Sequence, residues 1–219
     1  MEEKEPIVIS LGGSFIFNKS EELKELKRVI DSFHRNVTIV VGGGRLCRDY
    51  ISFAKYLGLS TNELHIVGIK ATILNAFVIS RALKYKFYNG SPDKTPKKGV
   101  NVMGGFYGGK YRPGNTTDVV AAIAAISVNS KTLLNLSKEK GVYDKDPEKH
   151  KNAKLLKKIS FDTFLSKTKN ARKPGMNFIF DPKAARMCKK ANIRVIVTSD
   201  LKDIKKVLNK EEVNGTVLS

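Results

Sequence analysis

Three clusters of glycine, each directly after a short apolar run, constrain the fold of this chain most strongly. They lie at Gly12-Gly13, at Gly42-Gly43-Gly44 and at Gly104-Gly105. A β-branched or aliphatic run that ends in glycine predicts a buried strand running into a loop with an exposed backbone. Without a Cβ, such a loop approaches an anion closely and presents several N–H groups to it. The pattern therefore predicts an α/β fold with phosphate-binding loops at the ends of strands.

Neither of the two common phosphate-binding fingerprints is present. The chain has no G-x-G-x-x-G pattern, and the segment most similar to a Walker loop, residues 104–110, continues with Tyr111 where that motif carries Ser or Thr. Glycine after a strand also serves simply to turn the chain, and this reading stays open for each cluster alone. Three clusters in one chain favour phosphate binding by another type of loop.

Length and composition indicate one globular unit. The chain has 219 residues, of which 41% are hydrophobic, enough for one sizeable core in a single domain or in two intimate lobes. It contains no run of 18 or more apolar residues, and its first six residues are acidic and polar. We therefore expect no signal peptide, no membrane span and a cytoplasmic location.

The net charge of +19 raises the question of nucleic-acid binding. Much of the excess lies in a lysine-rich stretch from Lys138 to Lys173, where aromatic residues that would stack on bases are scarce. Nucleic acid is therefore a disfavoured partner, although the charge leaves it open.

Cys47 and Cys188 have no metal-ligand spacing with each other or with histidine, so we expect reduced thiols and no protein metal site.

Hydrophobic periodicity predicts strands that alternate with helices. Strands are expected at residues 7–11, 37–41, 100–103, 131–136, 194–198 and 215–218. Helices are expected at residues 20–33, 45–56, 62–83, 119–126 (opened by Thr116) and 182–191, and a last helix is expected to begin at Ser199 and Asp200. This order is typical of a mostly parallel sheet covered by helices.

Several short motifs together carry a family resemblance. They are Gly12-Gly13-Ser14, Gly42-Gly43-Gly44 with Arg48 and Tyr50-Ile51, residues 113–118, Gly141-Val142-Tyr143 with Asp146-Pro147, Asp181-Pro182 with Ala184-Ala185, and Asn214-Gly215-Thr216. In order and spacing, over nearly the whole chain, they resemble the archaeal-type uridylate kinases of the amino acid kinase superfamily. The resemblance implies one amino acid kinase-like domain over residues 1–219, built as a three-layer α/β/α sandwich with a mostly parallel central sheet. It also implies an acceptor lobe at about residues 1–128, an ATP lobe at about 129–219, and a homo-oligomer, expected to be a hexamer.

The resemblance further implies an ATP-dependent transfer of phosphate to UMP, which makes UDP for pyrimidine nucleotide synthesis. ATP would contact Gly13, Ser14, Gly44, Arg48, Ser137, Lys138, Tyr143 and Asp146. UMP would contact Gly43, His65, Arg112, Pro113, Gly114, Asn115, Thr116, Thr117 and Asp118. Arg48 is the candidate catalytic residue, and Mg²⁺ would arrive bound to ATP rather than in a cage of protein ligands. Phosphoryl transfer of this kind needs positioning and charge neutralisation more than a protein nucleophile.

The chain also departs from the family pattern, mainly around the acceptor. His65 stands at the position of an aspartate, Ile73 at that of an arginine, Lys140 at that of an aspartate, and Ser10 where many superfamily members carry a catalytic lysine. Residues 107–111 lengthen the acceptor loop. Two alternatives therefore stay open: another small-molecule kinase of the superfamily, and a non-catalytic nucleotide-binding or storage protein on the same fold.

Some site residues have simpler structural readings. Arg48 would be an ordinary surface residue of its helix, Asp118 a partner of a helix dipole, and Tyr143 a packing residue. Asp181 precedes Pro182, which is the pattern of an N-cap followed by proline at the first helical position. We expect Asp181 to be a cap first and an organiser of the site second.

Overall fold

A computed structural model gives the arrangement of the chain. It describes residues 5–14, 20–32, 35–106, 108–110, 113–145, 147, 149–169, 179–209 and 211–219. The strands are β1 (Ile7–Leu11), β2 (Val37–Val41), β3 (Lys86–Phe87), β4 (Val100–Met103), β5 (Thr132–Leu136), β6 (Lys158–Ile159), β7 (Arg194–Thr198) and β8 (Thr216–Leu218). The helices are α2 (Ser20–Asp31), α3 (Gly44–Tyr56), α4 (Thr61–Leu83), α5 (Thr117–Ser127), α6 (Phe161–Lys169), α7 (Pro182–Lys190) and α8 (Lys202–Leu208), and a short 3₁₀ turn covers Pro92–Lys94.

The strands form one sheet in the order β3-β4-β2-β1-β5-β7-β8-β6. All neighbouring strands are parallel except β7 and β8, which pair antiparallel. The central strand β1 pairs along its length with β2 on one side and β5 on the other. The predicted mostly parallel sheet is therefore confirmed.

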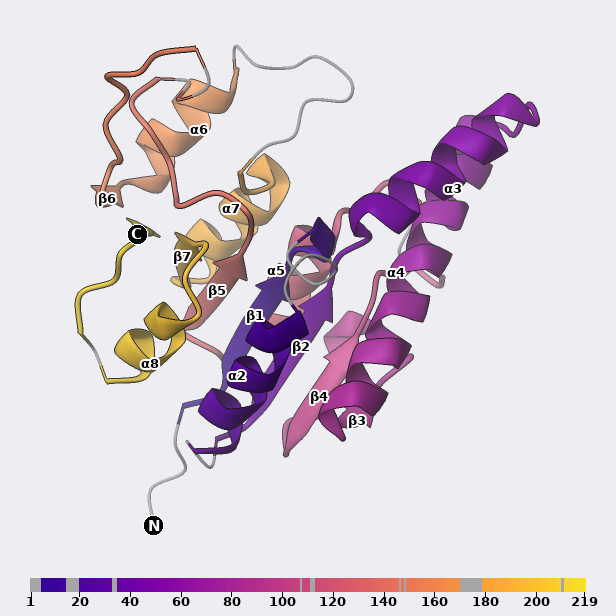
Figure 1. Cartoon of the computed structure of the whole chain (residues 1–219), viewed down its shortest axis with the longest axis horizontal. Helices are drawn as coiled ribbons and strands as arrows, with labels where there is room; N and C mark the ends of the chain where they lie inside the picture. The colour runs from indigo at the N-terminus through magenta and orange to yellow at the C-terminus, as the bar shows by residue number, and fades with distance from the viewer. Residues whose placement is uncertain are drawn as a thin grey trace.

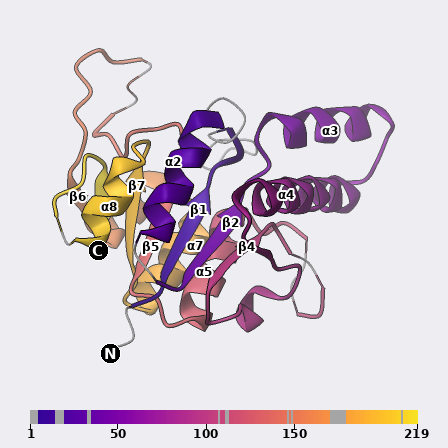
Figure 2. The ribbon, with the colours of Figure 1, turned by 60° about the horizontal axis from the view of Figure 1, so that its bottom comes forward.

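Helices cover both faces of this sheet, so the chain forms three layers (Figure 1). One face packs its apolar side chains, such as Val8 and Leu133, against the alanine-rich α5 and against α7. The opposite face, with Ile9 and Leu134, packs against α2, α4 and α8, and Figure 2 shows α2 and α8 side by side on that face. The central strands β1, β2 and β5 are buried along their whole length, so apolar residues fill most of their positions without alternation. The predicted α/β/α sandwich is confirmed.

The helix caps explain where two of the core helices, α4 and α5, begin. Ser60 accepts from the backbone N–H of Glu63, and the Glu63 carboxylate accepts from the Ser60 N–H, which makes a capping box ahead of α4. Thr116 caps α5 in a similar way through the N–H of Val119.

By length and apolarity α4 resembles a membrane-crossing helix, but many of its residues are buried inside this fold, as in the core helix of a globular protein.

Four elements differ from the sequence-based expectation. The strands β3 and β6 are too short for an alternating pattern to reveal them. The helix α6 was not predicted because its lysines and threonines hide two buried anchors, Phe161 and Phe164. The last helix begins at Lys202 rather than at Ser199, since the Asp200 side chain accepts from the Lys202 N–H in the turn before it.

Candidate active site

The larger of two cavities among the described residues opens at the carboxyl ends of β1, β2 and β5. It has a volume of about 860 Å³, and its wall includes Ser10, Gly13, Gly43 and Ser137. The chain crosses from β1 to β2 on one side, and β5 lies on the other side of β1. In open parallel sheets this reversal of direction leaves a crevice at the carboxyl ends, where ligands bind.

The first two glycine clusters meet at this crevice. The Gly42 N–H donates to the Leu11 carbonyl over 2.8 Å, and a Cβ on Gly13 would lie 2.1 Å from the Gly44 nitrogen. Gly44 itself has a φ of +62°, a left-handed conformation that favours glycine. Glycine is therefore required here because two backbones touch. The contact therefore brings two of the three predicted glycine loops together at the cavity.

The third glycine cluster has a different use, which corrects the expectation of a phosphate loop there. A Cβ on Gly104 would lie 2.6 Å from the Ile73 nitrogen of α4, and the Gly105 N–H donates to the Thr72 hydroxyl over 2.7 Å. Both glycines are buried, and neither is part of the cavity wall. They allow the loop after β4 to pack directly on the α4 backbone.

Helix α4 also holds the loop after β2. The side-chain amide of Asn75 donates to the carbonyls of Gly42 and Gly43 over 2.8 and 3.0 Å. Asn75 is 2% exposed, so this amide is committed to the loop. By accepting these donors, the carbonyls turn toward α4. Sequence reasoning missed Asn75 because a polar residue within an apolar helix shows no local motif.

Most of the residues predicted to bind ATP lie around the cavity. Gly13, Ser14, Arg48, Ser137, Lys138 and Tyr143 line it, and Gly44 lies behind Gly13 in backbone contact. The exposed Arg48 reaches the cavity from the second turn of α3. The Lys138 ammonium lies 3.2 Å from the Glu139 carboxylate at the same wall. Asp146 lies outside the described residues.

Asp118 is a partly buried carboxyl group in the wall of the cavity. Its Oδ1 accepts from the Ser10 hydroxyl over 2.8 Å, and its Oδ2 accepts from the Asp181 N–H over 3.1 Å. Desolvation raises the pKa of Asp118 to about 6, although the two hydrogen bonds oppose this shift. Ser10 therefore binds a carboxylate at the position where many superfamily members carry lysine.

The prediction that Asp181 is an N-cap is confirmed. It caps α7 by accepting from the N–H groups of Lys183 and Ala184, and its second oxygen accepts from the Thr116 hydroxyl over 2.7 Å. Its own N–H binds Asp118. Asp181 thus joins the start of α7 to the start of α5 beneath the cavity.

The residues predicted to bind UMP are divided between two places. Gly43, Thr117 and Asp118 line the main cavity, whereas Pro113, Gly114 and Asn115 line a second cavity of about 590 Å³ beside α5 and α7. The Lys183 ammonium donates to the Asn115 side chain over 2.7 Å in that second wall.

His65 and Arg112 complete the predicted acceptor set. His65 is exposed and does not line the main cavity, but its Nε2 lies 3.9 Å from where a Gly114 Cβ would be. The fold therefore brings His65 to the acceptor loop. Arg112 lies outside the described residues.

Other cavity residues gave no sequence signal. Asn135 of β5 lines the cavity and donates to the Ile179 carbonyl over 3.1 Å. Lys167 of α6 also lines it and donates to the Asp144 carbonyl over 3.2 Å. Both were missed because only folding brings them to the cavity, from elements far apart in sequence.

The described residues contain no group of three or more His, Cys, Asp or Glu side chains that could hold a metal ion. A Mg²⁺ ion bound through the phosphate oxygens of a nucleotide does not require such a group, because water and phosphate supply most of its ligands. The residues at the cavity therefore fit a metal that is carried in by its nucleotide.

Comparison with known proteins gives consistent matches over the whole chain. A sequence model of the amino acid kinase family matches residues 5–199. Curated uridylate kinases of Thermoplasma acidophilum and Methanobrevibacter smithii are 36% and 31% identical, over 98% and 97% of this chain and 96% and 99% of their own. The crystal structure of the uridylate kinase from Archaeoglobus fulgidus superposes with a TM-score of 0.82 at 30% identity, over 97% of this chain and 99% of that one. An aspartate kinase from Synechocystis shares the fold, with a TM-score of 0.76 at 17% identity.

Proposed function

The chain belongs to the amino acid kinase family, and on this basis we propose that it is an ATP-dependent UMP kinase that forms UDP. The single observation that carries the proposal is the contact between two glycine loops at the mouth of the cavity. There the loops after β1 and β2 touch at Gly13 and Gly44, beside Arg48. Two phosphate-binding loops in contact are what a transfer between two phosphorylated molecules requires, because donor and acceptor phosphates must lie in line and close together.

We assign a donor side and an acceptor side to the site. ATP lies along the loops after β1 and β5, held by Gly13, Ser14, Gly44, Arg48, Ser137, Lys138, Tyr143 and Asp146. The UMP phosphate lies at Gly43 and the start of α5, with Thr117 and Asp118. The nucleoside of UMP extends toward the acceptor loop, with His65, Arg112, Pro113, Gly114, Asn115 and Thr116.

The protein contributes positioning and charge. Backbone N–H groups of the glycine loops and the Arg48 guanidinium face the phosphates, where negative charge accumulates during transfer. The attacking atom is a phosphate oxygen of UMP, so no protein nucleophile takes part. The Asp118 carboxyl, held by Ser10 and Asp181, keeps the two helix starts in register beneath the reacting groups. A Mg²⁺ ion bound to the ATP phosphates would shield their charge, with phosphate and water as most of its ligands.

The proposal extends to assembly and location. Large apolar side chains are exposed along α3 and α4, among them Phe53 at 59%, Tyr56 at 85% and Phe77 at 42%. Apolar surface gathered on one projecting helix pair is typical of a protein interface. We assign this face to contact between copies of the chain in a homohexamer. The enzyme acts in the cytoplasm, in pyrimidine nucleotide synthesis.

A coupled assay of ADP release tests the proposed activity. Mg-ATP is supplied with UMP, CMP, dUMP, AMP, GMP, acetate, carbamate or isopentenyl phosphate in turn. We expect turnover with UMP far above the other acceptors. Preferred turnover of another acceptor would keep the family and overturn the substrate. ATP binding without turnover of any acceptor would overturn the enzymatic proposal.

A further inference from the structure

A buried hydroxyl is one of the anchors of the loop after β5. Residues of this loop, including Val142 and Tyr143, form one wall of the cavity. The Val142 N–H donates to the Thr216 Oγ1 over 2.8 Å, and Thr216 is fully buried. A Cβ on the preceding Gly141 would lie 2.4 Å from the same hydroxyl. The loop therefore packs against Thr216 at the point where it turns into the cavity.

Thr216 is in turn fixed by its place in the sheet. It is the first residue of β8 and pairs with Val197 of β7. The residue before it, Gly215, lies so close to β7 that a Cβ would be 2.0 Å from the Val197 carbonyl oxygen. Neither the backbone nor the side chain of Thr216 has freedom to shift without moving β7.

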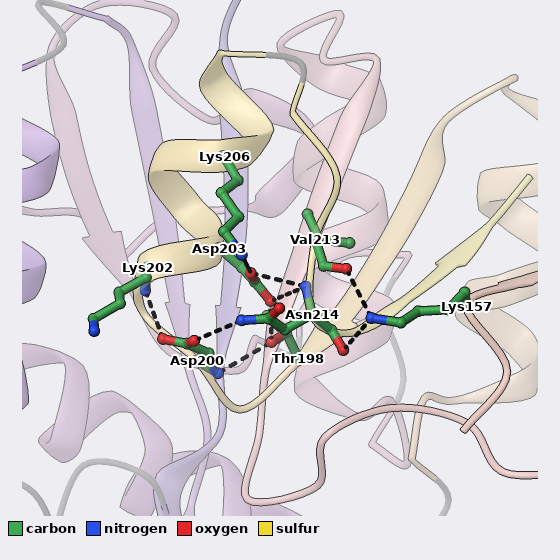
Figure 3. A network of polar contacts seen from close by, with 8 residues as sticks. All are labelled: Lys157, Thr198, Asp200, Lys202, Asp203, Lys206, Val213 and Asn214. Carbon is green, nitrogen blue, oxygen red and sulfur yellow. Dashed lines mark hydrogen bonds and ion pairs between the residues drawn. The ribbon is translucent and has the colours of Figure 1, made fainter. Parts of the chain in front are cut away.

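A buried carboxylate holds the turn that leads into β8 (Figure 3). Asp203 of α8 is fully buried and accepts from the Thr198 hydroxyl over 2.6 Å. Its two oxygens also accept from the Asn214 N–H over 2.9 and 3.0 Å. The Lys206 ammonium lies 3.5 Å from the same carboxylate and compensates its charge.

Two further contacts close the turn from the outside. The Asn214 side chain donates to Asp200 over 3.0 Å, and the Lys157 ammonium donates to the carbonyls of Val213 and Asn214, each over 3.3 Å (Figure 3). The hydrogen bonds of this turn therefore come from the end of β7, from α8 and from the segment before β6. Neither Asp203 nor Thr216 lines the main cavity.

We infer that Thr216, supported by Asp203, is a positioning residue for the ATP-binding loop. The path runs from the Asp203 carboxylate through Asn214 and Gly215 to the Thr216 hydroxyl, and from there to the Val142 amide in the wall of the cavity. It reaches the donor side of the site and has no contact with the acceptor loop among the hydrogen bonds described. These two residues therefore set the affinity for ATP without setting the affinity for UMP. The inference rests on the proposed function for its substrate names.

Replacement of Thr216 by valine tests this inference, because valine keeps the shape and removes only the hydroxyl. The Val142 N–H loses its acceptor, so we expect the KM for ATP to rise about tenfold while the KM for UMP stays within about twofold. Thr216→Ser keeps the hydroxyl and is expected to restore the wild-type KM. Asp203→Asn is expected to shift the KM for ATP in the same direction as Thr216→Val. The matched control is Thr38→Val, which makes the same change at a buried threonine of β2.

Amide hydrogen exchange separates this inference from the proposed activity, because it needs no turnover. Thr216→Val is expected to speed exchange at least tenfold at residues 139–145 and to leave β1 unchanged. If exchange rises in that loop but no nucleotide is turned over, the anchor stands and the proposed function fails. If both KM values rise together, or if exchange at residues 139–145 stays at the wild-type rate, the positioning role is overturned.

Discussion

At the scale of single residues, two ionisable groups of the cavity lie in opposite environments, one exposed to water and one desolvated. Arg48 is exposed and reaches the cavity from α3, so water stabilises its charge, and in the proposed site a phosphate would replace that water. The Asp118 carboxyl is desolvated and held by two donors. The first is suited to bind an anion, and the second to fix the protein around it.

Replacing Arg48 by alanine should therefore impair transfer without unfolding the protein. We expect kcat/KM to fall by about two to three orders of magnitude, since a charge-assisted contact to the transferred phosphate is lost. The melting temperature should stay within about 2 °C, because exposed substitutions change stability little. Arg45→Ala is the matched control, since Arg45 lies on the same helix, outside the cavity, and pairs with Asp49 at 3.5 Å. Equal activity of the two variants would remove Arg48 from the site.

The raised pKa of Asp118 predicts a pH dependence of stability. Its ordinary value is 3.8 and its value in the fold is about 6, so between these values the folded chain binds more protons than the unfolded chain. The contribution of Asp118 therefore falls as pH rises from about 4 to about 6, by at most about 3 kcal/mol, and stays low above that.

The Asp118→Asn variant should lack this decline. Urea unfolding between pH 4 and 7.5 would measure it as a wild-type slope steeper than that of the variant in this window. Parallel curves for the two proteins would contradict the assignment. The same substitution should also ease the ionisation of Cys188, whose pKa burial and the Asp118 charge raise to about 12.

Reasoning from the sequence found the residues that belong to motifs and missed those that only folding brings to the site. Gly13, Gly44 and Arg48 follow directly from a strand that ends in glycine. Asn75 and Asn135 carry no such mark, because an amide within an apolar helix or strand shows its partner only once the sheet is assembled.

At the scale of elements, the contact between α4 and the loop after β4 depends on the absence of one methyl group. A Gly104→Ala substitution would place a Cβ 2.6 Å from the α4 backbone. Backbone cannot move aside as a flexible side chain does, so we expect a loss of about 1–3 kcal/mol in the free energy of unfolding. Urea denaturation measures this loss.

The kinetics of the same variant test the reassignment of the third glycine cluster. Because Gly104 lies outside the cavity wall, the folded fraction of Gly104→Ala should keep the wild-type KM for ATP. A selective rise in the KM for ATP at unchanged stability would return this cluster to the phosphate site.

The elements themselves could be predicted where burial on both faces dictates the composition. The bounds of β1, β2, β4 and β7 agree with the apolar runs that predicted them, since a strand covered by helices on both faces is mostly apolar. The order of the strands could not be read in this way, because it depends on which crossover buries the most surface. The helix α6 was not predicted, for the opposite reason: only a few of its residues are apolar and pack against the core.

At the scale of the whole molecule, the helix pair α3 and α4 projects from one end of the sheet (Figure 2). Its exposed aromatic side chains predict association of the chains. Light scattering should give a mass six times the 24.3 kDa of one chain. Phe53→Glu places a charge in this surface and should lower the measured mass, whereas Lys205→Glu on α8 should not. An unchanged mass for Phe53→Glu would exclude this face as the interface.

The sheet passes from one half of the molecule to the other without interruption. Val8 to Leu11 of β1 pair in register with Leu133 to Leu136 of β5, so the halves to which we assign the two nucleotides are joined by a ladder of backbone hydrogen bonds. Two halves that share a continuous sheet do not move as rigid bodies about a flexible linker. When donor and acceptor are drawn together, the halves can approach only by changing the twist of the strands, and the stiffness of the sheet then opposes every closure and assists every release.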